Sequence, residues 1–380
     1  MKPFALLDDD NVYMPEKDYK RLAKYSVLPN DLLITVVGTL GNVAIVPENI
    51  KGIFSCKSTV FRDSTIDPYY LLAYFNCKYG HDCLLRRQRG AVQTGLNKED
   101  LKTIPVPIYS SKEHATIGDL IRNSLELSYK SKSLYGQAQD LLEKELGLDQ
   151  LVLKKAKSYE ASFSEIVGNG RADADHYQIQ YKQIKNLIKN YSNGFQPLLQ
   201  IVESISPNIN PRKTPATSFK YVELSNINPI LGIVDGYKIV SGISAPSRAK
   251  RRILIGEIIA SAVVGSVDKA GIVDETKEGA LASTGFFHFR TRGSSPYYLL
   301  LLVRSKIVKM QLLQEATGGI LSAVPDRNLE KIIIPILSKT LQGKLSSLVK
   351  DSHQAKKESE LLLGQAKKRV ENLIEGVIEQ

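Results

Sequence analysis

Two long stretches of the chain carry apolar residues at helical spacing, and they predict helices over about residues 112–146 and 340–379. In the first stretch a leucine occupies every seventh position, at Leu120, Leu127, Leu134, Leu141 and Leu148. This spacing is typical of a helix that packs along a second helix. Beside the leucine row both helices carry small residues, namely Ser124, Ser131 and Ala138 in the first and Ser352, Ser359 and Ala366 in the second. Small side chains permit close approach, so we expect the two helices to pack against each other, antiparallel.

The expected helix–helix interface comprises Leu120, Leu127, Leu134, Ala138, Leu141, Leu348, Leu362 and Ala366. Gly136 and Gly364 stand at equivalent positions in these helices, where each costs about 1 kcal/mol relative to alanine. Tight contact with the facing helix would explain both glycines. A helix of about 34 residues spans about 51 Å and would act as a spacer between two globular heads. The alternative is two amphipathic helices that each pack on their own domain.

Each long helix follows a segment of mixed character. Residues 32–37 and 42–46, and likewise 253–264 and 271–273, are β-rich and predict strands. The sequence Pro-Tyr-Tyr-Leu-Leu predicts the start of a helix in both segments, because proline is favoured in the first helical turn. The pattern therefore predicts two mixed domains, each followed by one long helix.

The two segments are copies of one unit. Pro68-Tyr-Tyr-Leu-Leu72 recurs 228 residues later as Pro296-Tyr-Tyr-Leu-Leu300, and Leu134-Tyr-Gly-Gln-Ala138 recurs as Leu362-Leu-Gly-Gln-Ala366. Further upstream the offset is 226 to 227, as between Ala44-Ile-Val46 and Gly271-Ile-Val273. Dispersed matches in one order at nearly one offset indicate an internal duplication.

The expected fold class is α/β (α+β), with two mixed α/β domains separated by two long antiparallel coiled-coil helices. The expected boundaries are 1–109 and 171–338 for the mixed domains, and 110–160 and 339–380 for the helices. Only 28 residues precede Pro29, whereas about 84 separate Arg171 from the equivalent region at Ile255. The first copy thus lacks a counterpart of roughly residues 171–221, so it is truncated, completed by another chain, or degenerate.

Counting charged residues by segment shows where the excess positive charge lies. The chain has 380 residues, with 51 Lys+Arg against 40 Asp+Glu and a formal net charge of +11. Residues 171–338 hold 21 basic and 13 acidic groups, so eight of the excess charges belong to the second mixed domain. A basic domain favours a polyanionic partner, with nucleic acid first. No apolar run reaches a membrane span, the first residues lack a secretory pattern, and three cysteines give no disulfide framework. We therefore expect a cytoplasmic protein with no membrane partner.

Basic residues gather in short clusters, which are the candidate DNA contacts. Clustered Arg and Lys neutralise phosphates and supply most nonspecific affinity, while a few would read base edges with Asn, Gln or Ser. A solvated face is the alternative interpretation of any one cluster. Tyr221, Tyr237, Tyr297 and Tyr298 are expected to be packing residues rather than platforms for base stacking. The candidate contacts are Arg86, Arg87, Arg89, Arg212, Lys213, Arg248, Lys250, Arg251, Arg252, Arg290 and Arg292.

Established catalytic motifs are absent from the sequence. It has no P-loop, no Gly-x-Gly-x-x-Gly after a strand, no HExxH and no Asn/Asp-Pro-Pro-aromatic segment of an amino-methyltransferase. Cys77 and Cys83 enclose His81, but the spacing is wrong for a zinc site and a fourth ligand is missing. Glu275 and Lys277, with Asp268 nearby, resemble the Mg²⁺ site of a nuclease, for which a charged turn is the simpler interpretation. We expect no catalytic and no metal-binding residues.

Together these features resemble the DNA-specificity subunit of type I restriction–modification systems, a family that alternates two target-recognition domains with two long helices. Residues 28–46 (LPNDLLITVVGTLGNVAIV) are similar to the family's strand–Gly–strand segment, and residues 255–273 are their second version. Pro-Tyr-Tyr-Leu-Leu, residues 329–335 and the heptad helices extend the resemblance. Residues 172–177 (ADADHY) resemble the usual entry into a recognition domain. The resemblance covers nearly the whole chain.

The resemblance implies a noncatalytic subunit in which each recognition domain reads one half of a split target in double-stranded DNA. The helices would set the gap and dock DNA methyltransferase (modification) subunits, and a separate motor-nuclease (restriction) subunit would cut. S-adenosylmethionine, Mg and ATP would belong to those partners, with no cofactor bound by this chain. Two other functions stay open: a Mg-dependent nuclease that uses Glu275 and Lys277, and a protein-only coiled-coil adaptor whose basic face is incidental.

Overall fold

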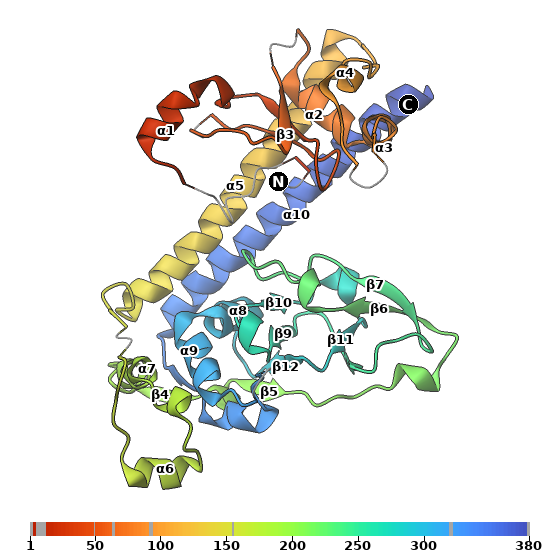
Figure 1. Ribbon diagram of the computed structural model, residues 1–380. Coiled ribbons are helices and arrows are strands. Elements are labelled where there is room, and N and C mark those ends of the chain that lie inside the picture. Colours follow the sequence, from red (N-terminus) through yellow and green to blue (C-terminus); the bar gives the residue numbers. More distant parts are fainter. Residues whose placement is uncertain are drawn as a thin grey trace. The chain divides into compact units, whose positions relative to one another are not determined.

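The structure is a computed structural model that describes residues 3–4, 13–48, 50–62, 65–90, 94–153, 156–318 and 322–377. Contacts divide the chain into two compact units, each containing part of both long helices (Figure 1). Unit 1 comprises residues 1–130 and 355–380, and unit 2 comprises residues 131–354. Helices α5 (Ser111–Glu145) and α10 (Lys339–Glu375) confirm the two long helices predicted from the sequence. Within the described part of the chain, no helix is both long and apolar enough to cross a membrane.

Unit 1 is built on a three-stranded antiparallel sheet with the order β2-β1-β3. Helix α2 begins at Pro68, as predicted, and its N-cap Asp67 accepts the N–H of Tyr69 at 2.8 Å. Its buried residues, Tyr70 to Phe75, pack with the sheet and with the adjoining parts of α5 and α10 in one core. The elements are α1 (Glu16–Arg21), β1 (Leu32–Thr35), β2 (Val43–Ile45), β3 (Ser58–Phe61), α2 (Pro68–Asn76), α3 (Lys78–Leu85) and α4 (Lys98–Leu101).

Unit 2 contains two four-stranded sheets, with the orders β10-β9-β12-β5 and β7-β6-β11-β8, and a strand pair, β13-β4. Its helices are α6 (Phe163–Asn169), α7 (Ile179–Lys189), α8 (Pro296–Arg304) and α9 (Lys306–Glu315). Its strands are β4 (Phe195–Pro197), β5 (Val202–Ser204), β6 (Ser218–Val222), β7 (Lys238–Ser241), β8 (Ala249–Arg252), β9 (Ile258–Ser261), β10 (Ala270–Ile272), β11 (Leu281–Ser283), β12 (Phe286–Thr291) and β13 (Ile333–Pro335).

The register of the strands confirms the duplication. Strands β10-β9-β12 of unit 2 repeat strands β2-β1-β3 of unit 1. Helices α2 and α8, and likewise α5 and α10, begin 228 residues apart. Equivalent residues hold equivalent places in the two ladders: Leu32 pairs with Ile45 and Phe61, and Ile258 pairs with Ile272 and Phe289.

Each of these sheets buries one carboxylate just before its central strand. Asp31 accepts two hydrogen bonds from the Arg62 guanidinium, at 2.7 and 2.6 Å. Glu257 accepts two from the Arg290 guanidinium, at 3.0 and 2.7 Å, and also contacts His288 Nε2 at 2.6 Å. Both carboxylates also accept the backbone N–H of the residue three positions earlier. The two copies therefore share a buried carboxylate–arginine pair as well as a register.

Rows of small residues line the contact between α5 and α10. In unit 1 the Ser124 hydroxyl donates to the carbonyl oxygen of Ser359 at 2.7 Å. In unit 2 the Ser352 hydroxyl donates to the carbonyl oxygen of Ser131 at the same distance. All four serines are buried. Such contacts between side chain and backbone require the two helices to approach closely, as the small residues predict.

The leucine row differs from the buried seam that its spacing predicts. Leu148 is buried beyond the end of α5, and the other leucines of the row lie on the flanks, because the short side chains occupy the space between the two backbones. Leu120 instead packs on the core of unit 1, and Leu141 packs on that of unit 2. Ala138 and Ala366 are fully buried. Side chains that are only partly buried are those of Leu120, Leu127, Leu134, Leu141, Leu348 and Leu362.

The explanation expected for the two helical glycines is wrong. A Cβ added at Gly136 or at Gly364 would meet no atom within 4 Å. Both glycines thus face open space, and close contact with the facing helix does not account for them.

Candidate nucleic-acid interface

Two connecting segments cross one face of the sheet β7-β6-β11-β8. Ile209 from the segment 208–217 and Ala245 from the segment 242–248 pack in the same small cluster as Tyr221 and Leu281 of the sheet. These two segments carry several of the basic candidates, so their attachment decides where those side chains lie.

Backbone hydrogen bonds attach the first segment to the edge strand β8. The Lys250 carbonyl oxygen accepts the N–H of Asn208 at 2.9 Å and that of Ile209 at 3.2 Å. The Asn208 side-chain oxygen accepts the N–H of Arg252 at 2.8 Å. The segment is therefore fixed along the strand that supplies Lys250 and Arg252.

The next part of the segment, the short 3-10 helix Pro211–Lys213, is pressed against the turn after β7. A Cβ at Gly242 would lie 2.2 Å from the carbonyl oxygen of Thr214 and 2.4 Å from that of Pro211, so only glycine fits there. Arg212 and Lys213 remain exposed above this contact.

Five candidate cations thus lie on the two segments and the adjoining strand, and we call this set the basic face. All five are exposed, and among the described residues their side chains form no ion pair. Exposed cations without a protein partner can displace counterions from a phosphate backbone. The basic face consists of Arg212, Lys213, Arg248, Lys250 and Arg252.

Arg251 does not belong to the basic face, contrary to expectation. In strand β8, Lys250 and Arg252 are exposed whereas Ala249 and Arg251 are buried, and the pairing with β11 shifts register between Arg251 and Ala249. The Arg251 guanidinium donates to the carbonyl oxygen of Ile205 and to the Asp326 carboxylate, the latter at 3.0 Å. With 2% of its surface exposed, Arg251 is a structural residue.

The last two candidates of unit 2 lie on or just after β12, in the other sheet. Arg290 is bound to the buried Glu257 and lies 3.5 Å from Glu203, so its charge is already compensated. Arg292 is exposed, with a 3.5 Å contact to the carbonyl oxygen of Leu199.

In unit 1 the arginines that follow α3 have different surroundings. Arg87 donates to the hydroxyl and carbonyl oxygens of Thr103, both at 2.8 Å, and Arg89 pairs with Asp100. Arg86 is exposed and has no ion pair among the described residues. Of this cluster, Arg86 is the side chain best placed to meet a phosphate.

The tyrosines divide into two groups. Tyr221 and Tyr298 are buried and Tyr297 is partly buried, and burial raises the pKa of the Tyr298 hydroxyl. Tyr237 is 41% exposed, contrary to expectation, and the Lys220 ammonium lies 5.0 Å from its ring centroid. An exposed aromatic ring beside a lysine suits contact with nucleic acid. In the sequence, Tyr237 directly precedes the edge strand β7.

The nuclease alternative is not favoured by the geometry. The Lys277 ammonium binds Asp274 at 2.9 Å, and Asp274 caps the short 3-10 helix that contains Glu275. Hydrogen bonds from Thr276 and Lys277 outweigh the effect of burial and hold the pKa of Asp274 below its usual value. The described residues contain no group of three or more His, Cys, Asp or Glu side chains placed to hold a metal ion.

No family model matches the chain. Over 142 residues the chain is 29% identical to the type I restriction enzyme EcoBI specificity subunit of Escherichia coli, which confirms the resemblance predicted from the sequence. The match covers 36% of this chain and 28% of that relative, so it spans little more than a quarter of the relative's length.

Two solved structures are similar over most of their length. One is a type I restriction–modification S subunit from M. genitalium, with 13% identity, a TM-score of 0.45, and coverage of 91% of this chain and 84% of that one. The other is the HsdS subunit from Thermoanaerobacter tengcongensis, with 14% identity, a TM-score of 0.32, and coverage of 93% and 82%.

Proposed function

We propose that the chain is a noncatalytic DNA-specificity subunit of a type I restriction–modification system. The observation that carries this proposal is the duplication, in which one mixed unit and one long helix occur twice with the same strand register. Two related recognition domains on a single chain suit a target that consists of two separate half-sites. The similarity to a specificity subunit supports the same assignment.

The proposed ligand is double-stranded DNA, and the basic face of unit 2 is its proposed phosphate contact. Its five exposed cations suit the polyanion, because they are not neutralised by neighbouring carboxylates. In unit 1, Arg86 is the corresponding candidate. The proposed protein partners are methyltransferase and motor-nuclease subunits, which would hold S-adenosylmethionine, Mg and ATP.

Selection from a randomised duplex pool tests the proposal. The chain would be incubated with the pool with and without a cognate methyltransferase subunit, and bound duplexes would be sequenced. We expect enrichment of a motif made of two short half-sites at a fixed separation. Recovery of unenriched sequence under both conditions would reject the assignment, and metal-dependent cleavage by the isolated chain would favour the nuclease instead.

A further inference from the structure

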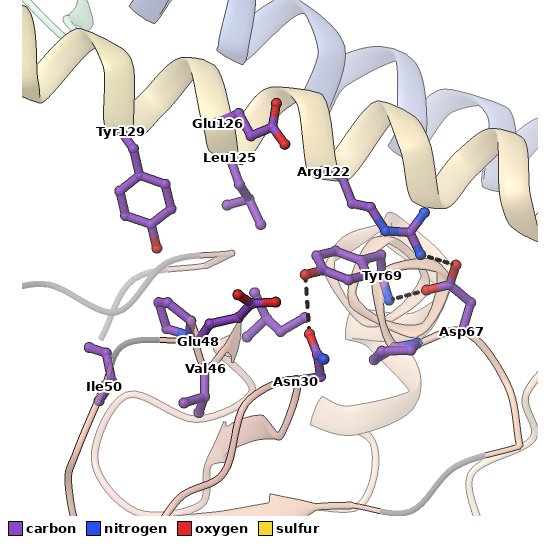
Figure 2. Close-up of a pocket in the computed structure, with 13 residues that line it drawn as sticks. Asn30, Val46, Glu48, Ile50, Asp67, Tyr69, Arg122, Leu125, Glu126 and Tyr129 are labelled. Carbon is purple, nitrogen blue, oxygen red and sulfur yellow. Dashed lines mark hydrogen bonds and ion pairs between the residues drawn. The ribbon is translucent and has the colours of Figure 1, made fainter.

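Unit 1 has an open cavity of about 840 Å³ between the end of β2, the start of α2, and helix α5 (Figure 2). Ile45, Val46 and Ile50 line its strand side, Tyr69 lies at the start of α2, and Leu125 lies on α5. Its walls are thus apolar where the sheet and the helix face each other, which suits apolar side chains.

Unit 2 fills the equivalent place with a turn of its own chain. Ile272, equivalent to Ile45, donates its N–H to the carbonyl oxygen of Gly232 at 3.1 Å. His353, equivalent to Leu125, donates from Nε2 to the carbonyl oxygen of Leu231 at 2.7 Å. Leu231 is 3% exposed and belongs to the main core of the unit. In unit 2, the gap between β10 and α10 is therefore filled by an apolar turn of the same chain.

Unit 1 retains the outer part of this arrangement. Phe4 pairs in parallel with Ala44 of β2, and Ile233 pairs in parallel with Ile272 of β10, one register position further along. Among the residues that the structure describes in unit 1, none takes the place that Leu231 holds in unit 2. The gap between β2 and α5 is therefore present in unit 1, and no described residue of the unit fills it.

The rim of the cavity carries more negative charge than the equivalent place in unit 2. Asp67 is paired with Arg122 at 2.5 Å, whereas Glu48 and Glu126 are exposed and have no ion pair among the described residues. Burial raises the pKa of the Tyr69 hydroxyl, Arg122 lowers it, and the nearby carboxylates of Asp67, Glu48 and Glu126 raise it further. Gln354 stands at the position equivalent to Glu126, so the additional negative charge there belongs to unit 1.

We propose that this cavity docks an apolar turn of a partner polypeptide that carries a lysine or arginine beside its apolar residues. The apolar side chains take the place that Leu231 holds in unit 2, against Ile45 and Leu125. The cation pairs with Glu48 and Glu126, for which the chain supplies no partner among the described residues. The site uses none of the basic face, so it stands or falls independently of the proposed DNA recognition.

A labelled peptide with the unit 2 turn sequence and one added lysine, Asn-Pro-Ile-Leu-Gly-Ile-Lys, tests the site by fluorescence anisotropy on the full chain. We expect saturable binding, weakened about 5-fold when the peptide lysine is changed to glutamate, because exposed ion pairs contribute little. Replacing Ile-Leu of the peptide by Ser-Ser weakens binding at least about 10-fold, because apolar burial supplies most of the affinity.

Variants of the protein assign the peptide to the cavity. Glu48→Lys/Glu126→Lys reverses the preference between the lysine and glutamate peptides, whereas Asp140→Lys, an exposed change on α5 outside the cavity, leaves it unchanged. No saturation up to about 1 mM peptide, or the same affinities for the reversed variant, overturns the proposal. The proposal would also be overturned if the wild type self-associates and Glu48→Lys/Glu126→Lys abolishes this association. The occupant of the cavity would then be a second copy of the chain.

Discussion

At the scale of single residues, Glu257 shows how a charge is kept inside unit 2. Burial alone would raise the pKa of this carboxyl, but hydrogen bonds from His288, from the backbone N–H of Leu254 and from Arg290 outweigh it and hold the pKa below its usual value. The carboxylate is thus buried, with hydrogen-bond partners on both oxygens. Such a group stabilises a fold only while all of its partners remain in place.

Replacing this carboxylate by its neutral amide removes the charge while the shape is kept. We expect Glu257→Gln to lower the free energy of unfolding by about 2 kcal/mol, because the buried His288 and the half-exposed Arg290 lose hydrogen bonds to a charged acceptor. Urea denaturation measures the change. Glu203→Gln is the matched control, since Glu203 is half-exposed and lies 3.5 Å from the same arginine; its effect is expected to stay below about 1 kcal/mol. Equal effects of the two changes would contradict this role of Glu257.

We expect the stability of unit 2 to depend on pH through His353. Burial lowers the pKa of its imidazole, and Arg304 adds to the effect. Below the ordinary pKa of about 6.5, the unfolded chain therefore binds a proton that the folded chain does not. The free energy of unfolding should fall by up to about 1.4 kcal/mol per pH unit as the pH decreases through this range.

Denaturation of the wild type and of His353→Leu between about pH 7.5 and 5.5 separates this contribution from those of the other histidines. The variant carries the residue that unit 1 has at the equivalent position, Leu125. We expect it to lose the same hydrogen bond at every pH and to show the shallower pH dependence. Parallel curves for the two proteins would exclude the effect.

At the scale of elements, the pair α5 and α10 presents two glycines to open space. We expect Gly136→Ala and Gly364→Ala each to raise the free energy of unfolding by about 0.5 to 1 kcal/mol, because alanine restricts the unfolded chain and meets no atom in the folded one. Thermal and urea denaturation both report this gain.

Gly80 in α3 is the contrasting control. A Cβ there would lie 2.0 Å from the carbonyl oxygen of Tyr74, so Gly80→Ala should destabilise the fold. A loss of stability in Gly136→Ala would mean that its surroundings are not open.

Periodicity and repetition made the elements predictable, because both depend on short stretches of chain. The two long helices, the start of α2 at Pro68 and the duplication are all readable in this way. The position of the contact between the helices was predictable in part. The small residues Ser124 and Ser131 predict it correctly, whereas the leucines expected at the interface are only partly buried.

The candidate site shows the same limit. A run of basic residues marks a strand region, but the segments that pack against the strand decide which of its side chains are buried. Arg251 is buried because Ile205 and Asp326, far away in the chain, supply its partners. No feature of the local sequence distinguishes Arg251 from Lys250 and Arg252. Only the tertiary structure shows that Arg251 is buried and does not belong to the basic face.

At the scale of the whole molecule, the basic face gives a prediction for DNA affinity. We expect Lys250→Ala/Arg252→Ala to reduce the slope of log K against log salt by about 1.8, because each lost phosphate contact removes about 0.9. Filter binding or anisotropy over a salt series measures it. Lys144→Ala, an exposed change on α5, is the control and should leave the slope unchanged. An unaltered slope in the double variant would remove these two residues from the DNA contact.

The serine contacts between the two long helices carry one more consequence. Ser124 meets Ser359, and Ser131 meets Ser352, where Ser352 and Ser359 are the copies of Ser124 and Ser131. Each helix therefore offers the other the same surface that it receives, which is the property of an isologous interface. A shorter polypeptide that held one copy of the repeat would carry both halves of this contact, and two such polypeptides could associate as a homodimer through it.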